Sequence, residues 1–173
     1  MEAGIVFNDF VEKDGRIYVN LISQGLTGQE WINKFESEGR ILSSEVKIIL
    51  RSKAFIPTNG VIYKLVIIRG AQFAYGERTI ANVRELAYSK GYFKARLEIA
   101  CLLRELISDD KAKKMSLYSL AVVSTHAGKE FTRILGFDID DNPNSLQTYC
   151  VKDILRWRRS TGFVFSTSKT KCK

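Results

Sequence analysis

The side chains best suited to binding chemistry lie near the C-terminus. Arg156, Trp157, Arg158 and Arg159 are consecutive in the sequence. Guanidinium groups pair with phosphates, and an exposed tryptophan offers a face on which a nucleobase can stack. Alternatively, Trp157 anchors a strand in the core while the arginines extend around it to solvent. The candidate binding residues are Lys152, Arg156, Trp157, Arg158, Arg159, Lys169 and Lys171, with Tyr149 as a further aromatic candidate.

The charge distribution supports this segment as a contact for polyanions. The chain has 27 basic and 19 acidic residues and a net charge of +8. Positions 152–173 hold seven basic residues against one acid, Asp153. A basic terminus on a nearly neutral domain is typical of proteins that bind nucleic acid or a nucleoprotein. The same surface would also fit an acidic partner protein, so a protein-interaction or inhibitor module is the alternative function.

His126 is the one candidate for acid–base chemistry. It follows Ser124 and Thr125, and Glu130 lies close by in the sequence. A histidine at a strand end can act as a general base, which leaves a hydrolase as a third possible function. Neighbouring strand residues point to opposite faces, and no nucleophile motif surrounds the histidine. The sequence therefore favours a non-enzymatic module over an enzyme.

Metal-ligand patterns are weak throughout. Cys101, Cys150 and Cys172 do not have the spacing of a zinc site, even with His126 included. Asp138, Asp140 and Asn142 resemble the start of a calcium loop, but Pro143 and Tyr149 stand where glycine and glutamate are needed. We expect no metal and no cofactor.

A helix-turn-helix over residues 79–106 is the remaining nucleic-acid motif to weigh. Arg96 and Arg104 would be available for contact. The second helix, over residues 95–107, is apolar on more than one side, whereas a recognition helix needs a polar face for the groove. The pattern favours a buried helix.

The helix and strand patterns along the chain predict one α+β domain over residues 1–165, which must position these side chains, and a basic tail over 166–173. We expect a helical N-terminal half, a central β-strand at 61–68 and a C-terminal antiparallel sheet. The N-terminal half begins with a turn at Asp14–Gly15 and a strand at 16–22. Thr27 and Glu30 form a capping box for a helix that ends at Gly39. Further helices are expected at 43–50, from residue 80 to Gly91, and at 95–107, and strands at 117–123, 131–139, 146–151 and 163–165.

Composition predicts a cytoplasmic protein. No apolar run reaches the 18 residues of a membrane span, and residues 1–10 lack the basic start of a secretory signal. Three widely spaced cysteines are typical of a reducing compartment.

Several stretches resemble a group of small bacterial single-domain proteins to which no activity is attached. The similarity spans roughly residues 26–168. In that group, the position resembling His126 is followed by an acid and a proline, whereas this chain has Ala127 and Gly128. The resemblance implies a self-contained domain and no particular chemistry. The stretches that carry it are residues 28–31 (GQEW), 57–61 (PTNGV), 98–105 (EIACLLRE), 108–109 (SD) and 162–165 (GFVF).

Overall fold

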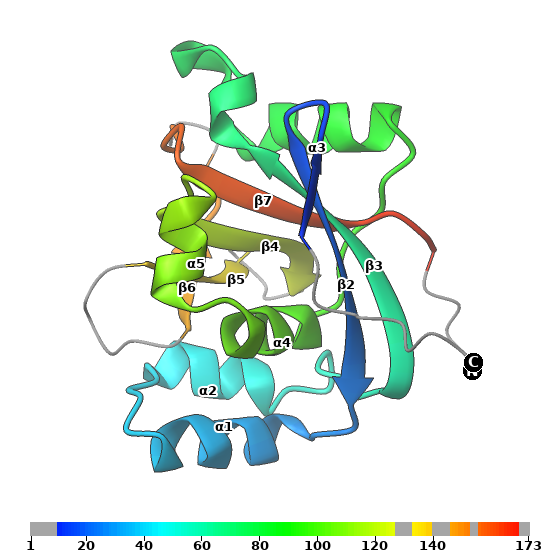
Figure 1. Cartoon of the computed structure of the whole chain (residues 1–173). Helices are drawn as coiled ribbons and strands as arrows, with labels where there is room; N and C mark the ends of the chain where they lie inside the picture. The colour runs from blue at the N-terminus through cyan, green and yellow to red at the C-terminus, as the bar shows by residue number, and fades with distance from the viewer. Residues whose placement is uncertain (1–9, 127–132, 140–145, 153–155, 170–173) are drawn as a thin grey trace, which may run out of the picture.

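One mixed seven-stranded sheet organises the chain (Figure 1). The computed structural model describes residues 10–126, 133–139, 146–152 and 156–169. The strand order is β1-β2-β3-β7-β4-β5-β6, and every pair is antiparallel except β4 with β7, which is parallel. The strands are β1 Val11–Lys13, β2 Arg16–Gln24, β3 Asn59–Arg69, β4 Ser119–His126, β5 Arg133–Asp138, β6 Gln147–Cys150 and β7 Thr161–Ser166.

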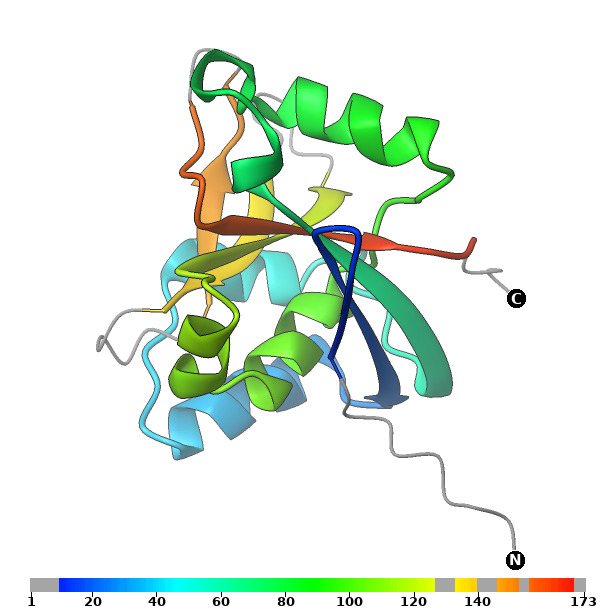
Figure 2. The same cartoon turned by 45° about the horizontal axis from the view of Figure 1, so that its top comes forward.

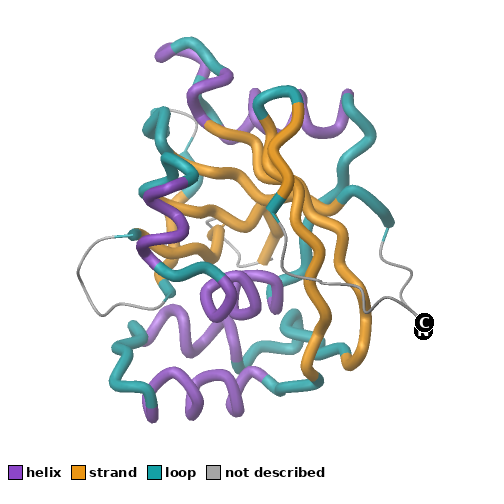
Figure 3. Tube along the Cα trace, in the orientation of Figure 1, coloured by secondary structure: helices purple, strands orange, loops and turns teal. Residues whose placement is uncertain are grey.

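Helices cover both faces of this sheet (Figures 2 and 3). α3 packs on one side, which we call the α3 face, together with the short 3-10 turns η1 and η2. α1, α2, α4 and α5 cover the opposite face. The helix bounds are α1 Gly28–Ser37, α2 Ser44–Leu50, η1 Gly70–Gln72, η2 Tyr75–Glu77, α3 Ile80–Ser89, α4 Glu98–Leu106 and α5 Asp109–Lys114.

The expected division into a helical N-terminal half and a C-terminal antiparallel sheet is wrong, although the broader α+β description holds. β1, β2 and β3 all come from the N-terminal half and form one side of the sheet. β7, expected as a closing strand, lies in the middle between β3 and β4. Its six residues are all buried, because neighbouring strands flank it and helices cover both faces. The sheet is therefore assembled from both halves of the chain.

Local signals at the start of the chain are confirmed. Thr27 accepts a hydrogen bond from the backbone of Glu30, whose carboxylate accepts one from the Thr27 backbone, which completes the capping box. Asp14 and Gly15 have φ of 52° and 71° and form the turn between β1 and β2. Gly39, just past α1, has φ of 77°, which suits the end of a helix.

Strand alternation divides the apolar residues between two cores. In β3, Leu65 and Ile67 face α1, α2 and α4, whereas Val66 and Ile68 face α3. A strand covered on both sides needs apolar residues at successive positions, which explains the uninterrupted run in its second half. Buried cores therefore pack against both faces of the sheet from which the side chains at the strand ends project.

Candidate nucleic-acid interface

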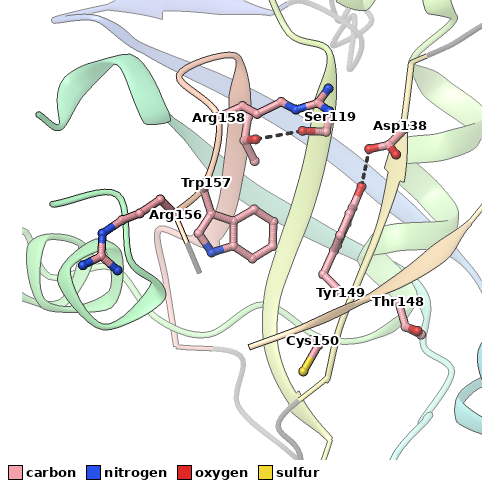
Figure 4. A pocket seen from close by; sticks show the side chains of 9 residues that line it. Ser119, Asp138, Thr148, Tyr149, Cys150, Arg156, Trp157 and Arg158 are labelled. Atoms are coloured by element: carbon pink, nitrogen blue, oxygen red, sulfur yellow. Dashed lines mark hydrogen bonds between the residues drawn. The ribbon is translucent and has the colours of Figure 1, made fainter. Parts of the chain in front are cut away.

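A cavity of about 350 Å³ opens on the α3 face, above β4, β5 and β6 (Figure 4). Pairing register places Thr161, Ser119 and Asp138 side by side across β7, β4 and β5. Their side chains line the cavity, and the Ser119 and Thr161 hydroxyls are hydrogen-bonded at 2.8 Å. The floor of the cavity is therefore a row of three polar groups in an otherwise apolar part of the sheet.

Tyr149 of β6 forms one wall. It pairs with Ile134 of β5, and its ring extends over Gly136 toward the end of that strand. There its hydroxyl donates a 2.7 Å hydrogen bond to Oδ1 of Asp138 and accepts one of 3.1 Å from the amide of Gln147. Burial raises the pKa of Tyr149, and the hydrogen bond to Asp138 raises that pKa further. Tyr149 therefore stays a protonated donor, and Asp138 keeps its role as an acceptor.

The raised pKa makes a spectroscopic prediction. The unfolded chain loses this proton near pH 10, so stabilisation from Tyr149 is present below about pH 10 and declines above it. In a titration followed by tyrosinate absorbance, Tyr149→Phe and the unsubstituted protein should give the same amplitude between about pH 9 and 11. Only after unfolding in alkali should the variant lack the signal of one of seven tyrosines. A smaller amplitude in the variant before unfolding would contradict the buried hydrogen-bonded state.

Trp157 forms the second aromatic wall. Its ring contacts Tyr149 and Phe163 edge to face, with centroids 5.2 and 5.3 Å apart. Trp157 is half-buried, so it both packs on the sheet and borders the cavity. The sequence left open an exposed or a core role for this residue, and the structure combines the two.

The backbone around Trp157 is fixed against neighbouring segments. The Trp157 N–H donates to the carbonyl of Arg78, just before α3, at 2.9 Å. Gly70 lies so close that a Cβ there would be 2.3 Å from the carbonyl oxygen of Arg158. These contacts set the position at which the following arginine side chains leave the surface.

Arg156, Arg158 and Arg159 are exposed beside this cavity, and Arg156 and Arg158 line it. Lys152 is exposed as well. Arg158 and Arg159 make no salt bridge with any described residue. The arginine run and Tyr149, predicted together from the sequence, do meet at one site.

Lys169 lies elsewhere. It follows β7, whereas Arg158 precedes that strand, so the length of β7 (roughly 20 Å) separates them. Its ammonium is 5.7 Å from the centre of the Phe93 ring, in an open hollow also lined by Tyr88, Lys94 and Arg96. This second basic and aromatic cluster lies at the C-terminal end of α3. The tail was expected to begin at residue 166, but Thr167 is bound to β3. Its backbone N–H and its hydroxyl both donate to the carbonyl of Lys64.

Charge is unevenly distributed between the two faces. Outside the strands, residues 70–94, 151–152, 156–160 and 167–169 on the α3 face carry nine basic residues and two acids, Glu77 and Glu85. The segments on the opposite face, residues 28–56 and 97–114, carry nine basic and eight acidic residues. The positive charge of the described part is therefore concentrated around α3. The nine residues are Arg78, Arg84, Lys90, Lys94, Lys152, Arg156, Arg158, Arg159 and Lys169.

Most of the other candidates from the sequence lie outside the described residues. His126 ends β4 opposite Arg133, but the placement of its side chain lies outside the described part, as does Lys171. Asp140 and Asn142 of the calcium-like loop also lie outside it, while Asp138 contacts Tyr149. No group of three potential metal ligands occurs among the described residues.

A helix-turn-helix does not form over residues 79–106. α3 and α4 pack on opposite faces of the sheet, and the segment between them passes along the end of β7 through a bridge from Phe93 to Ser166. α4 is buried along most of its length, and Arg104 on it is 8 % exposed. The expectation that this helix belongs to the core is confirmed.

The three residues of the cavity floor, Ser119, Thr161 and Asp138, were missed by sequence reasoning or given another role. Ser119 and Thr161 are the polar first residues of β4 and β7, which is the only local signal they carry. Their shared location depends on the parallel pairing of β4 with β7, and nothing in the sequence around either residue indicates that pairing.

Comparisons with protein-family models, curated proteins and solved structures give no significant match for this chain. Among the helices of the described residues, none is long and apolar enough to cross a membrane.

Proposed function

We propose that this protein binds single-stranded nucleic acid on its α3 face, with the segment around Arg156–Arg159 as the principal contact. The observation that carries the proposal is the concentration of basic residues around a cavity with aromatic walls. Phosphate pairing and counterion release supply affinity for any nucleic acid, whereas aromatic walls recognise unpaired bases.

The geometry favours single strands over duplexes. A base can enter the cavity, against the Tyr149 and Trp157 walls and above the polar floor, only when it is unstacked and unpaired. The second cluster around Phe93 and Lys169 lies at the far end of β7, so an extended strand of several nucleotides could contact both. We place this activity in the cytoplasm, since three widely spaced cysteines are typical of a reducing compartment.

The test is a fluorescence-anisotropy titration of labelled single-stranded RNA, single-stranded DNA and duplex DNA at several salt concentrations. The triple variant Arg156→Ala, Arg158→Ala, Arg159→Ala should bind single strands more weakly. Its plot of log affinity against log salt should be shallower by about 2, because roughly 0.7 of a counterion is released for each phosphate contact.

A matched control separates local contact from net charge. Arg51, Lys53 and Lys114 are exposed on the opposite face, so replacing all three with alanine removes the same charge. This control should retain most of the affinity and the salt slope. Equal losses in both triple variants would show that only net charge matters and would overturn the proposed site.

An acidic partner protein remains the alternative occupant of the same surface. In that case the protein would show little affinity for oligonucleotides at physiological salt and would form a 1:1 complex with one acidic protein, weakened by the Arg156, Arg158, Arg159 variant. That outcome would replace the nucleic-acid proposal with the interaction module.

A further inference from the structure

The cavity holds a carboxylate where the surroundings are basic. Asp138 lies at its floor, and Arg156 and Arg158 lie around it. A site for phosphate alone gains nothing from a carboxylate, since like charges repel. A carboxylate acceptor inside the cavity and arginines around it together match a nucleotide. The base edge of a nucleotide donates hydrogen bonds, and its phosphate is negative.

We propose that this cavity binds one nucleobase of the strand and selects guanine, with Asp138 accepting from the base edge and Arg158 pairing with a phosphate. The inference rests on the proposed function and adds a base preference to it. Figure 4 shows the arrangement: Asp138 and Tyr149 point toward each other on one side, and the arginine segment lies on the other.

The chemistry of the acceptor determines the preferred base. An ionised carboxylate only accepts, and each of its two oxygens has two lone-pair directions. Oδ1 of Asp138 uses one of these for the Tyr149 hydroxyl, so acceptor capacity remains on both oxygens. Guanine presents two adjacent donors, the N1–H and the N2 amino group, to such a pair. Adenine and cytosine present one amino donor, and the single N–H of uracil stands between two carbonyl oxygens that a carboxylate repels.

The size and walls of the cavity agree with a base as occupant. Its volume of about 350 Å³ lies within the range of small-ligand sites. Tyr149 and Trp157 supply apolar walls, as in proteins that read an extruded base by its edge and by stacking. Arg158 is exposed and lines the cavity, in a position to pair with a phosphate that remains at the surface.

The experiment titrates the full chain with the 5′-monophosphates of guanosine, adenosine, cytidine and uridine, and with guanosine itself, by isothermal calorimetry. The guanine nucleotide should bind about tenfold more tightly than the other three. Asp138→Asn should remove this preference while leaving affinity for oligouridylate unchanged or higher, because a negative charge has been lost. Glu85→Gln, on α3, removes the same charge outside the cavity and should keep the preference.

Asp138→Asn also alters the contact with Tyr149, so a second variant tests the site independently. Arg158→Ala should weaken binding of the guanine nucleotide about tenfold and leave binding of guanosine unchanged, since only the nucleotide has a phosphate for Arg158 to contact. Equal binding of all four nucleotides, or retention of the preference in Asp138→Asn, would overturn the inference. If oligonucleotides still bind through the arginines in that case, the proposed function stands and only the base pocket fails.

Discussion

Replacing Glu98 with alanine should lower the free energy of unfolding by about 3–5 kcal/mol. Glu98 begins α4 and is 2 % exposed. Its carboxylate accepts hydrogen bonds from the Thr58 backbone at 3.0 Å, from the Thr58 hydroxyl at 2.7 Å and from the hydroxyl of Tyr63. Arg96 also pairs with it at 3.5 Å. One buried side chain thus connects α4 to the start of β3 and the loop before it.

The large effect follows from the donors that the substitution leaves behind. The Tyr63 hydroxyl is buried and the Thr58 N–H is partly buried, and a buried donor without an acceptor costs about 1–3 kcal/mol. Losing one of the partners of the largely buried Arg96 adds to this cost. Urea denaturation at neutral pH gives the difference directly.

Two further variants test whether the buried hydrogen bonds of the Glu98 carboxylate cause the loss of stability. Glu98→Gln keeps the shape of the side chain and one acceptor oxygen, so it should lower the free energy of unfolding by less than Glu98→Ala does. Glu105→Ala, on the same helix, removes a half-exposed pair with Lys34 and should cost less than about 1 kcal/mol. If Glu98→Ala were as mild as Glu105→Ala, the network around α4 would contribute little to stability.

The fold could be predicted where the determining interactions are local. The capping box of α1 involves Thr27 and Glu30, three residues apart, and the hairpin turn involves Asp14 and Gly15. The central position of β7 could not be predicted in this way. It depends on the parallel pairing of Ser119 with Thr161, 42 residues away, and parallel pairs have no turn to mark them.

The same distinction explains what the sequence indicated about the site. The run from Arg156 to Arg159 is contiguous, so its basic and aromatic character was visible. In the sequence, Asp138 resembles the first residue of a calcium loop. Its actual neighbours, Tyr149 and Ser119, are distant in the sequence and are brought to it by the pairing of β5 with β6 and with β4. A residue's chemistry was readable from sequence only where its partners are sequence neighbours.

Gly136→Ala should both destabilise the protein, by about 2 kcal/mol, and weaken its binding of single strands. Gly136 lies in β5, between Ala121 of β4 and Gln147 of β6. A Cβ at this position would lie 2.0 Å from the carbonyl oxygen of Leu120 and 2.6 Å from Cε2 of Tyr149. Relief requires both the Leu120 backbone of β4 and the tyrosine ring to move, which changes the floor and the wall of the cavity.

Gly76→Ala is the matched control, since a Cβ there meets no atom within 4 Å. It should leave stability within about 1 kcal/mol of the unsubstituted protein and leave binding unchanged. Denaturation and anisotropy titration of both variants give the two comparisons. If Gly136→Ala matched Gly76→Ala in both measurements, the close approach of Tyr149 to β5 would not constrain the site.

A double-variant cycle with Tyr149→Ala identifies which contact Gly136 accommodates. Once the ring is absent, the new methyl group still collides with the Leu120 carbonyl but no longer with the ring, so the two losses of stability should sum to more than the loss in the double variant. Fully additive losses would assign the whole cost to the strand backbone. The expected coupling would instead show that glycine at 136 is what allows the tyrosine ring to cross the sheet and reach Asp138.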